Sequence, residues 1–227
     1  MRILDLFCKA GGASVGMNRA FPSAQIIGVD IEPQPNYPFE FIQGDALTFP
    51  VDEFDFIWAS PPCQAHTSLK RSAWDKDLIP ETRSLLLSSN RPYIIENVVG
   101  APLINPIVLC GSYFNLKTAD GSQLRRHRQF ECSFPVGKSV PCSHSNVTIG
   151  LFGNKARNTA LEKRHYSKPK ETRGSPPKGI LFTLKDAQDA METPWMTMRE
   201  MSQAIPPAYS EYLLNKFKKY MKSGDTY

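Results

Sequence analysis

The chain has 227 residues, of which 41% are hydrophobic, and a formal net charge of +5. A chain of this length can bury a full core in one domain, or in one domain with a small appendage. It contains no apolar run long enough to span a bilayer and no signal peptide, so we expect a cytoplasmic protein without a membrane partner. Five cysteines are an odd number for a disulfide scaffold and fit reduced thiols better.

The positive charge is concentrated in one segment of the chain. Residues 121–185 hold 13 Lys and Arg against three acidic residues, whereas the rest of the chain holds 14 against 19. A concentrated positive segment beside a neutral-to-acidic body is typical of proteins that bind a polyanion. A solvated basic loop would have the same composition, and charge alone does not separate the two interpretations.

The chain opens with the pattern of a nucleotide-binding α/β unit. Residues 2–7 form a short apolar strand, which runs into a turn containing Gly11 and Gly12 and then into a helix that ends near Phe21. Glycines in such a turn let the backbone approach a ligand closely, and the amino terminus of the helix favours polar or negative groups.

The next two expected strands are each followed by an acid. Residues 25–29 lead into Asp30, and residues 39–42 are followed closely by Asp45. An acid at the tip of the second strand can accept both hydroxyls of a ribose, and Asp45 could accept from an adenine amino group. The three tips together predict a cofactor that contains adenosine, and the absence of G-x-G-x-x-G argues against a dinucleotide.

A cysteine on a rigid turn is the first residue expected to carry chemistry. Residues 54–58 form an apolar strand, and Pro61 and Pro62 then stiffen the chain just before Cys63. Open α/β sheets bind ligands at the carboxyl ends of their strands, and a thiolate there is a nucleophile. The alternative is a small buried hydrophobic side chain. We expect the polar loop over residues 64–80 to act as a lid.

Glu96 is the second such residue, because it follows the apolar strand expected over residues 92–95. A carboxylic acid at a strand end can be buried enough to hold a proton near neutral pH, although an isolated glutamate is more often exposed. With Cys63 on the same edge of the sheet, the sequence favours a thiol nucleophile paired with a carboxylic acid.

Two arginines are expected on one face of a strand over residues 125–130. Arg126 and Arg128 alternate there, so together they could grip a phosphate and a base carbonyl; a basic solvent face is the alternative. Residues 131–185 show little periodicity, so we expect irregular structure there and disorder within residues 155–178.

A cluster of cysteines and histidines in the same region raises the question of a metal. Cys132, Cys142 and His144, with His127 nearby, could be read as a zinc site. Their spacing matches none of the usual zinc-binding patterns, so we predict no metal site.

The ordered motifs resemble those of the cytosine-5 DNA methyltransferases, in the compact form often carried by phages and prophages. The motifs are Asp5-Leu6-Phe7, Gly11-Gly12, Asp30, Gly44-Asp45, Pro61-Pro62-Cys63-Gln64, Glu96-Asn97-Val98, Arg126-x-Arg128 and Gln203-Ala204-Ile205-Pro206-Pro207. The resemblance covers residues 1–130 and 186–215. It implies an α/β, Rossmann-like fold of the S-adenosylmethionine-dependent methyltransferases. A catalytic domain over residues 1–130 plus 186–227 would then carry a small, irregular, basic target-recognition region over residues 131–185.

The resemblance also implies roles for individual residues. S-adenosylmethionine, whose product is S-adenosylhomocysteine, would be held by Phe7, Gly11, Gly12, Asp30, Ile31, Asp45 and Pro62. Cys63 would attack carbon 6 of a cytosine flipped out of double-stranded DNA, with Glu96 at N3 of the base. Arg128 would point at the base carbonyl and Arg126 would support that face. We expect a monomer, because one active site serves one base.

Four positions depart from the family pattern. Lys9 stands where glycine is usual, so its side chain must point away from the cofactor, and Ala65 replaces a proline. Leu124 and Gln203 replace a glutamine and an asparagine. Two other functions remain open: cytosine-5 methylation of RNA such as transfer RNA, and a catalytically weak relative that only binds DNA.

Overall fold

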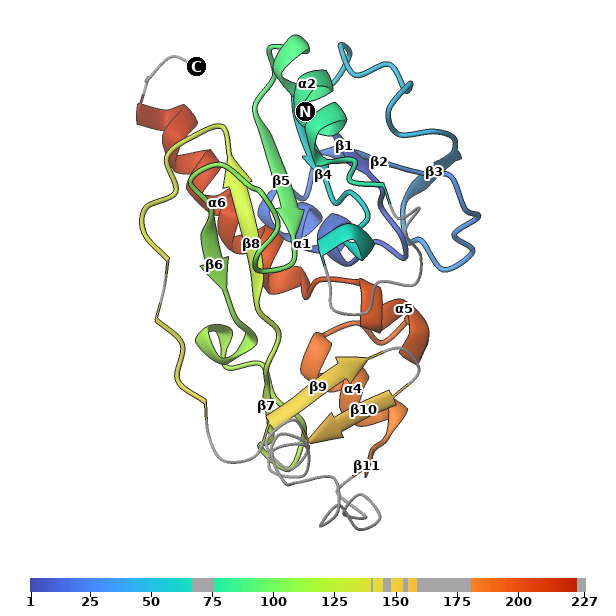
Figure 1. The fold of residues 1–227 in the computed structure, drawn as a ribbon, viewed down its shortest axis with the longest axis vertical. Helices are drawn as coiled ribbons and strands as arrows, with labels where there is room; N and C mark the ends of the chain where they lie inside the picture. Colours follow the sequence, from blue (N-terminus) through green and yellow to red (C-terminus); the bar gives the residue numbers. More distant parts are fainter. Residues whose placement is uncertain (67–75, 140, 145–147, 153–154, 159–180, 224–227) are drawn as a thin grey trace. The chain divides into compact units, whose positions relative to one another are not determined.

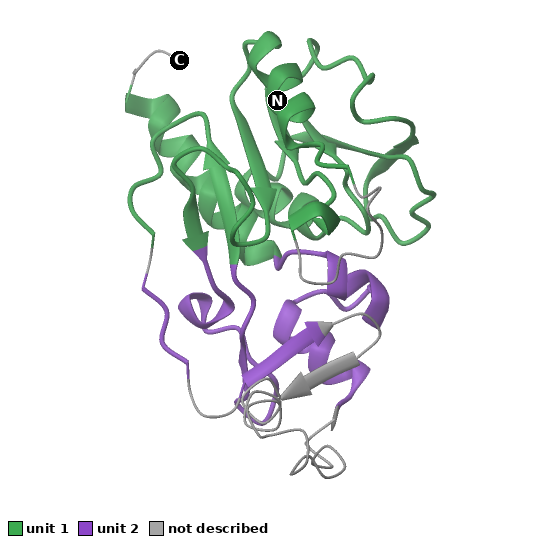
Figure 2. Ribbon diagram, viewed as in Figure 1, with its two compact units in different colours: residues 1–108, 128–139, 207–227 green, residues 109–127, 140–206 purple. Residues whose placement is uncertain are grey.

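The structure, a computed structural model, describes residues 1–66, 76–139, 141–144, 148–152, 155–158 and 181–223. These residues form two compact units (Figure 2). Unit 1 consists of residues 1–108, 128–139 and 207–227, and unit 2 of residues 109–127 and 140–206. These bounds differ from the two regions expected from the sequence, because residues 109–127 and 186–206 cluster with the smaller unit.

Unit 1 is built on a seven-stranded sheet with the order β3-β2-β1-β4-β5-β8-β6 (Figure 1). The strands are β1 (Arg2–Leu6), β2 (Gln25–Asp30), β3 (Glu40–Gln43), β4 (Phe56–Ala59), β5 (Tyr93–Asn97), β6 (Ile107–Leu109) and β8 (Arg128–Cys132). Strands β1 to β5 run parallel to one another, and β8 runs antiparallel to β5. The central strands are apolar on both faces, as expected of parallel strands that helices cover on both sides.

Helices cover both faces of this sheet. They are α1 (Gly12–Ala20), α2 (Ile79–Ser88) and α6 (Pro207–Ser223), with a short 3₁₀ helix, η1 (Gln64–His66). The ring of Phe217 on α6 lies 4.9 Å from that of Phe56, while Ile79 and Leu86 of α2 share a buried cluster with Ile57. Because successive strand residues point to opposite faces, α6 and α2 lie on opposite sides of β4.

The contact between α1 and α6 joins two parts of the chain that are far apart in sequence. A Cβ on Gly16 would lie 2.0 Å from the carbonyl oxygen of Pro207, so only glycine fits at this crossing. The hydroxyl of Ser210 donates to the carbonyl of Ala13 at 2.8 Å. The carboxyl-terminal helix is thereby packed directly against the helix that follows β1 and its glycine turn.

Unit 2 contains a four-stranded sheet with the order β11-β10-β9-β7. Its elements are η2 (Gly111–Phe114), β7 (Gln123–Leu124), β9 (Thr148–Phe152), β10 (Lys155–Asn158), β11 (Leu181–Phe182), α4 (Leu184–Met191) and α5 (Met198–Gln203). The prediction of irregular structure throughout residues 131–185 is therefore wrong. The disorder predicted within residues 155–178 falls mostly on residues outside those described. No helix in the described part of the chain is both long and apolar enough to cross a membrane.

Candidate active site

The predicted site residues of unit 1 gather at one edge of its sheet. Strands β1, β2, β3, β4 and β5 are parallel, so their carboxyl ends lie side by side. Asp30 ends β2, Cys63 follows β4, and Glu96 lies next to the last residue of β5. The three residues therefore lie at one edge of the sheet, as the sequence predicted for Cys63 and Glu96, with β1 between the strands that lead to Asp30 and Cys63.

The turn after β1 is an unusually bent piece of backbone. Phe7, Lys9 and Gly11 all have positive φ, at 59°, 46° and 77°. A left-handed conformation costs about 1–2 kcal/mol for a residue other than glycine, so surrounding bonds must hold the turn. The backbone N–H of Lys9 donates to Asp30 Oδ2 at 3.1 Å, and that of Gly11 to the carbonyl of Cys8 at 3.0 Å. The turn is thus fastened to the tip of β2.

The side chain of Lys9 lies on the acid that we expected to bind a ribose. Its Nζ is 3.4 Å from Asp30 Oδ1 and 2.9 Å from Glu32 Oε2, and Asp30 is only 3% exposed. Burial lowers the pKa of Lys9, but the hydrogen bond to Glu32 and the charge of Asp30 outweigh it and raise that pKa. The expectation that Lys9 points away from the predicted cofactor residues is therefore wrong, because two acids lie within its reach.

A buried polar group lies beneath the same turn. The hydroxyl of Ser14 donates to Asp5 Oδ2 and lies 2.6 Å from the hydroxyl of Tyr37. Burial raises the pKa of Asp5 to about 7, against the effect of the Ser14 bond and with help from the charges of Asp30 and Glu96. Sequence reasoning missed Ser14 and Tyr37, because nothing local marks their contact with β1.

Two glycines make room for Tyr37. A Cβ on Gly28 would lie 2.3 Å from Cζ of the Tyr37 ring, and a Cβ on Gly11 would lie 2.9 Å from its Cδ2. Gly28 is in the middle of β2, where glycine is otherwise unfavourable. A glycine in an apolar strand next to a predicted ligand turn was the one available signal of this close approach.

The predicted adenine-binding residues lie around the tips of β2 and β3. Ile31 is 69% exposed, whereas Phe7 packs partly against the core beneath the sheet edge. Asp45 is exposed, and its Oδ1 accepts from the backbone N–H of Leu47 at 2.9 Å. The N–H of Gly44 donates to the carbonyl of Asp30 at 3.0 Å, which brings the two acidic tips together.

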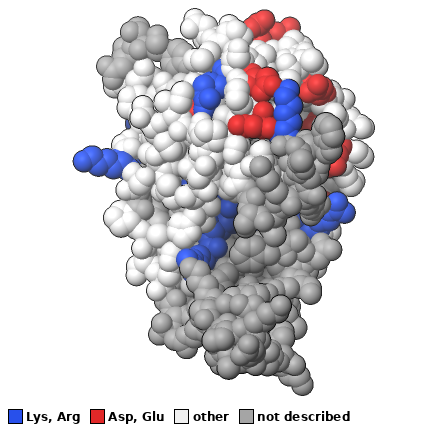
Figure 3. Space-filling model, in the orientation of Figure 1, with Lys and Arg blue, Asp and Glu red and all other residues white. Residues whose placement is uncertain are grey.

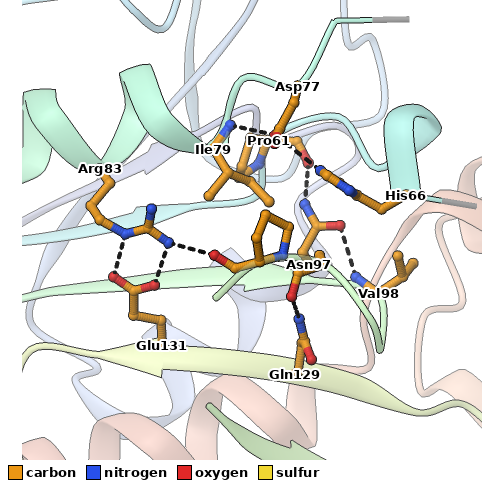
Figure 4. Close-up of polar contacts among 11 residues, drawn as sticks. Pro61, His66, Asp77, Ile79, Arg83, Asn97, Val98, Gln129 and Glu131 are labelled. Carbon is orange, nitrogen blue, oxygen red and sulfur yellow. Dashed lines mark hydrogen bonds and ion pairs between the residues drawn. The ribbon is translucent and has the colours of Figure 1, made fainter. Parts of the chain in front are cut away.

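The turn that carries Cys63 is anchored from the neighbouring strand (Figure 4). The side-chain amide of Asn97 donates to the carbonyl of Pro61 at 3.0 Å, and its Oδ1 accepts from the N–H of Val98 at 2.9 Å. Asn97 is 1% exposed, whereas Cys63 is half-buried. The N–H of His66 donates to the carbonyl of Cys63 at 3.0 Å and closes the first turn of η1.

Glu96 is buried and paired. Its Oε1 lies 3.1 Å from Nε of Arg128, and the two side chains are 9% and 16% exposed. The antiparallel pairing of β5 with β8 produces this contact, because Arg128 begins β8 where Glu96 approaches the end of β5. The prediction that Glu96 is buried at a strand end is confirmed, and its partner is one of the two predicted arginines.

Arg126 does not share a strand face with Arg128. Strand β8 begins at Arg128, so the predicted strand over residues 125–130 is wrong at its start. Arg126 belongs to unit 2, where it is 6% exposed and its Nη2 donates to the carbonyl of Ser202 at 2.9 Å. The alternation of two arginines with His127 and Gln129 looked like a strand, but only the second half of it pairs with β5.

The predicted lid over residues 64–80 lies largely outside the described residues, which resume at residue 76. The two described ends of this loop meet (Figure 4). Asp77 Oδ1 lies 2.9 Å from His66 Nε2 and accepts from the N–H of Ile79 at 2.9 Å. Burial raises the pKa of Asp77, but these two hydrogen bonds outweigh it and lower that pKa. The loop therefore starts and ends at one point beside Cys63.

A buried ion pair fixes β8 from the opposite side. Arg83 on α2 binds Glu131 through two bonds, Nε to Oε1 at 2.9 Å and Nη2 to Oε2 at 2.8 Å (Figure 4). Glu131 Oε2 also accepts from the N–H of Ile104 at 2.8 Å. Because Arg128 lies on the same strand, this pair helps to position the arginine that contacts Glu96.

Comparison with known proteins bears on the fold. No protein-family model and no curated protein sequence matches the chain. A solved methyltransferase from Entamoeba histolytica, EhMeth, covers 99% of this chain and 98% of its own, at 13% identity and a TM-score of 0.56. An RNA methyltransferase from Salinibacter ruber in complex with S-adenosyl-L-homocysteine covers 63% of this chain and 86% of its own, at 14% identity and a TM-score of 0.34. The plantazolicin methyltransferase BpumL covers 43% and 39%, at 17% identity and a TM-score of 0.32.

The match to EhMeth extends over both chains, so the protein has the Rossmann-like α/β fold of a methyltransferase. This confirms the predicted fold class. The two partial matches are too distant to carry an argument. Substrate and cofactor must be inferred from the residues of the site itself.

Proposed function

We propose that this protein is an S-adenosylmethionine-dependent methyltransferase that acts on carbon 5 of cytosine in double-stranded DNA. The observation that carries the proposal is the position of Cys63. It lies on a turn anchored by a buried asparagine, beside the end of β5, where Glu96 pairs with Arg128 of β8. A candidate adenosine site lies on the same edge of the sheet. One edge of the sheet therefore carries a nucleophile, an acid that would contact the base, and a cofactor site. This arrangement agrees with the motifs that resemble the cytosine-5 methyltransferases.

The residues at the tips of β1, β2 and β3 fit S-adenosylmethionine. Ile31 leaves a large apolar side chain 69% exposed directly after the buried carboxylate of Asp30, which offers a flat ring a surface beside an acceptor for ribose hydroxyls. Asp45 would accept from the adenine amino group, and Phe7, Gly11, Gly12 and Pro62 would line the rest. The bound cofactor supplies an electrophilic methyl group, and the side chains of the protein supply the rest of the chemistry.

Cys63 and Glu96 would have separate roles in the reaction. The thiolate of Cys63 adds to carbon 6 of a flipped cytosine, and a new C–S bond forms while negative charge moves toward N3. Glu96 offsets that charge by sharing a proton with N3. Arg128 holds Glu96 in place through the 3.1 Å contact, and it would donate to the base carbonyl. After methylation, loss of the proton on carbon 5 lets the thiolate leave.

The positive charge of residues 121–185 supports a polyanion such as DNA as the substrate. RNA is also a polyanion, so this charge would attract it as well. Residues 121–185 carry 13 Lys and Arg, but six of these lie within residues 159–180, outside the described part of the chain. On the face drawn in Figure 3, acidic side chains gather in the upper part of the picture, and basic ones are scattered among uncharged residues. Phosphate contacts would therefore depend mainly on unit 2, whose residues would also read the target.

The test is transfer of a labelled methyl group to genomic DNA and, in parallel, to transfer RNA, followed by bisulfite sequencing. We expect methylcytosine in DNA with wild-type protein, none above background with Cys63→Ala, and an unchanged yield with Cys132→Ala. Transfer to RNA alone would replace DNA with RNA in the proposal. Equal activity of Cys63→Ala and wild type would refute the covalent mechanism. Cofactor binding without methyl transfer to either polymer would refute the proposal that the protein is an active methyltransferase.

A further inference from the structure

Four side chains with metal-binding atoms converge in unit 2. They are Cys110, His127, Cys142 and His144, and their sulfur and imidazole nitrogen atoms all lie within 4.8 Å of one another. Cys110 Sγ is 3.2 Å from His144 Nε2, and Cys142 Sγ is 3.3 Å from His127 Nε2. The two imidazole rings are perpendicular, with centroids 5.0 Å apart.

This arrangement has nearly the dimensions of a tetrahedral zinc site. Zinc–sulfur and zinc–nitrogen bonds of about 2.3 and 2.0–2.1 Å place neighbouring ligand atoms roughly 3.4–3.8 Å apart. The observed separations of 3.2 and 3.3 Å are slightly shorter, as hydrogen-bonded pairs would be. A shift of a few tenths of an ångström in each side chain would open the space for an ion.

The composition of the cluster also points to a metal. The whole chain has five cysteines and four histidines, and four of these nine residues meet at this one place. Two thiolates and two imidazoles form a ligand set that favours zinc over magnesium or calcium, which prefer oxygen. With four protein ligands the site is closed, which is typical of a structural rather than a catalytic zinc.

We propose that unit 2 binds one zinc ion through Cys110, His127, Cys142 and His144, and that this ion fixes the fold of the unit.

The ligands come from three segments of the chain, two of which flank the neighbouring strands β6 and β8. Cys110 lies between β6 and η2, His127 lies just before β8, and Cys142 and His144 lie in a stretch without helix or strand before β9. Strands β7 and β9 of the same unit pair over only two residues each. A metal bond between these segments would supply the stability that such a small sheet lacks.

The structure changes the cysteine considered from the sequence. Cys132 is part of β8 in unit 1, so it does not belong to the cluster. Its place is taken by Cys110, which lies 17 residues before His127. Cys142 and His144 are separated by one residue, which is unlike the usual zinc-finger spacing. The prediction of no metal site therefore rested on spacing, and spacing does not show which segments meet.

The first test measures the metal directly in the full-length wild-type protein. We expect about one zinc per chain by elemental analysis after purification without chelators. X-ray absorption should show two sulfur neighbours at about 2.3 Å and two nitrogen neighbours at about 2.0 Å. Protein that contains no zinc after expression with added zinc and after reconstitution would overturn the proposal. So would a Cys110–Cys142 disulfide, seen as two missing hydrogens in the intact mass.

Variants then identify the ligands. Cys110→Ser and Cys142→Ser should lose the bound zinc and lower the melting temperature of the protein, whereas Cys132→Ala should keep the full zinc content. Wild-type zinc content in Cys110→Ser would overturn the assignment. If a serine variant fails to fold, cobalt substitution of the wild type decides, because two thiolate ligands give intense sulfur-to-cobalt absorption. A cobalt spectrum without such bands would refute the proposal.

Discussion

Asn97 connects the strand that carries Glu96 to the turn that carries Cys63, so its removal should separate catalytic positioning from cofactor binding. The substitution Asn97→Ala deletes the amide that donates to the carbonyl of Pro61 at 3.0 Å. It also deletes the oxygen that accepts from Val98 at 2.9 Å. Pro61 is buried, so water cannot easily replace the donor that its carbonyl loses.

Leaving a buried carbonyl without a partner costs about 1–3 kcal/mol, and this is the expected loss of folding free energy. The effect on turnover should be larger than this loss suggests. A misplacement of the reacting group by about 1 Å can lower a rate by roughly 100-fold. We therefore expect kcat for methyl transfer to fall between about ten- and 100-fold. The KM for S-adenosylmethionine should change much less, because all of its proposed contacts except Pro62 lie at the tips of β1, β2 and β3.

The assay pairs urea unfolding, followed by the fluorescence of the buried Trp58, with steady-state methyl transfer. Gln129→Ala is the matched control. Gln129 lies opposite Asn97 in the register of β5 and β8, is 5% exposed, and bonds to the loop at residues 100–101 rather than to the Cys63 turn. Both variants should lose similar stability, but only Asn97→Ala should lose kcat out of proportion. Equal kcat in the two variants would show that Asn97 acts on stability alone.

Three further substitutions test other parts of unit 1. Arg83→Met should destabilise the protein by about 3–5 kcal/mol in urea unfolding, because it leaves the carboxylate of Glu131 buried without a positive charge beside it; removing both charges should restore much of that loss. Gly16→Ala should lower the melting temperature, because its Cβ would lie 2.0 Å from the carbonyl oxygen of Pro207; an unchanged melting temperature would mean that α6 moves freely. Asp5→Asn should flatten the pH dependence of stability. The wild-type pKa of Asp5 is raised from 3.8 to about 7, so stability contributed by the protonated acid falls as pH rises through that window. A wild-type curve that is flat over the same window would contradict the raised pKa.

The sequence predicted the first five strands and the residues at their ends. Those strands are short apolar runs bounded by glycine, proline or charged residues, so each run marks a buried strand wherever its neighbours lie. Asp30, Cys63 and Glu96 come at the ends of such runs or shortly after them. Parallel strands bring their carboxyl ends to one edge of the sheet, so local patterns were enough to bring these three residues together.

Features that depend on pairing between distant segments could not be predicted in this way. Arg126 and Arg128 alternate like strand residues, but pairing with the partner strand β5 begins only at Gln129. Strand β9 pairs with β7, which lies more than twenty residues earlier and is itself only two residues long. The convergence of Cys110 with Cys142 depends on the same long connections. Such contacts leave no periodic pattern of apolar and polar residues in the sequence.

Lys9 shows how a departure from the pattern of the cytosine-5 methyltransferases, which the sequence resembles, can fit the proposed site. Its ammonium is 2.9 Å from Glu32 but 3.4 Å from Asp30, so the contact with Asp30 is the weaker of the two. A ribose that binds Asp30 would therefore displace only this weaker contact, while the ion pair between Lys9 and Glu32 would remain. The ammonium would still place a positive charge beside Asp30 and Glu32. The lysine thus takes the place of a glycine without closing the site, at the cost of a positive φ that glycine would adopt freely.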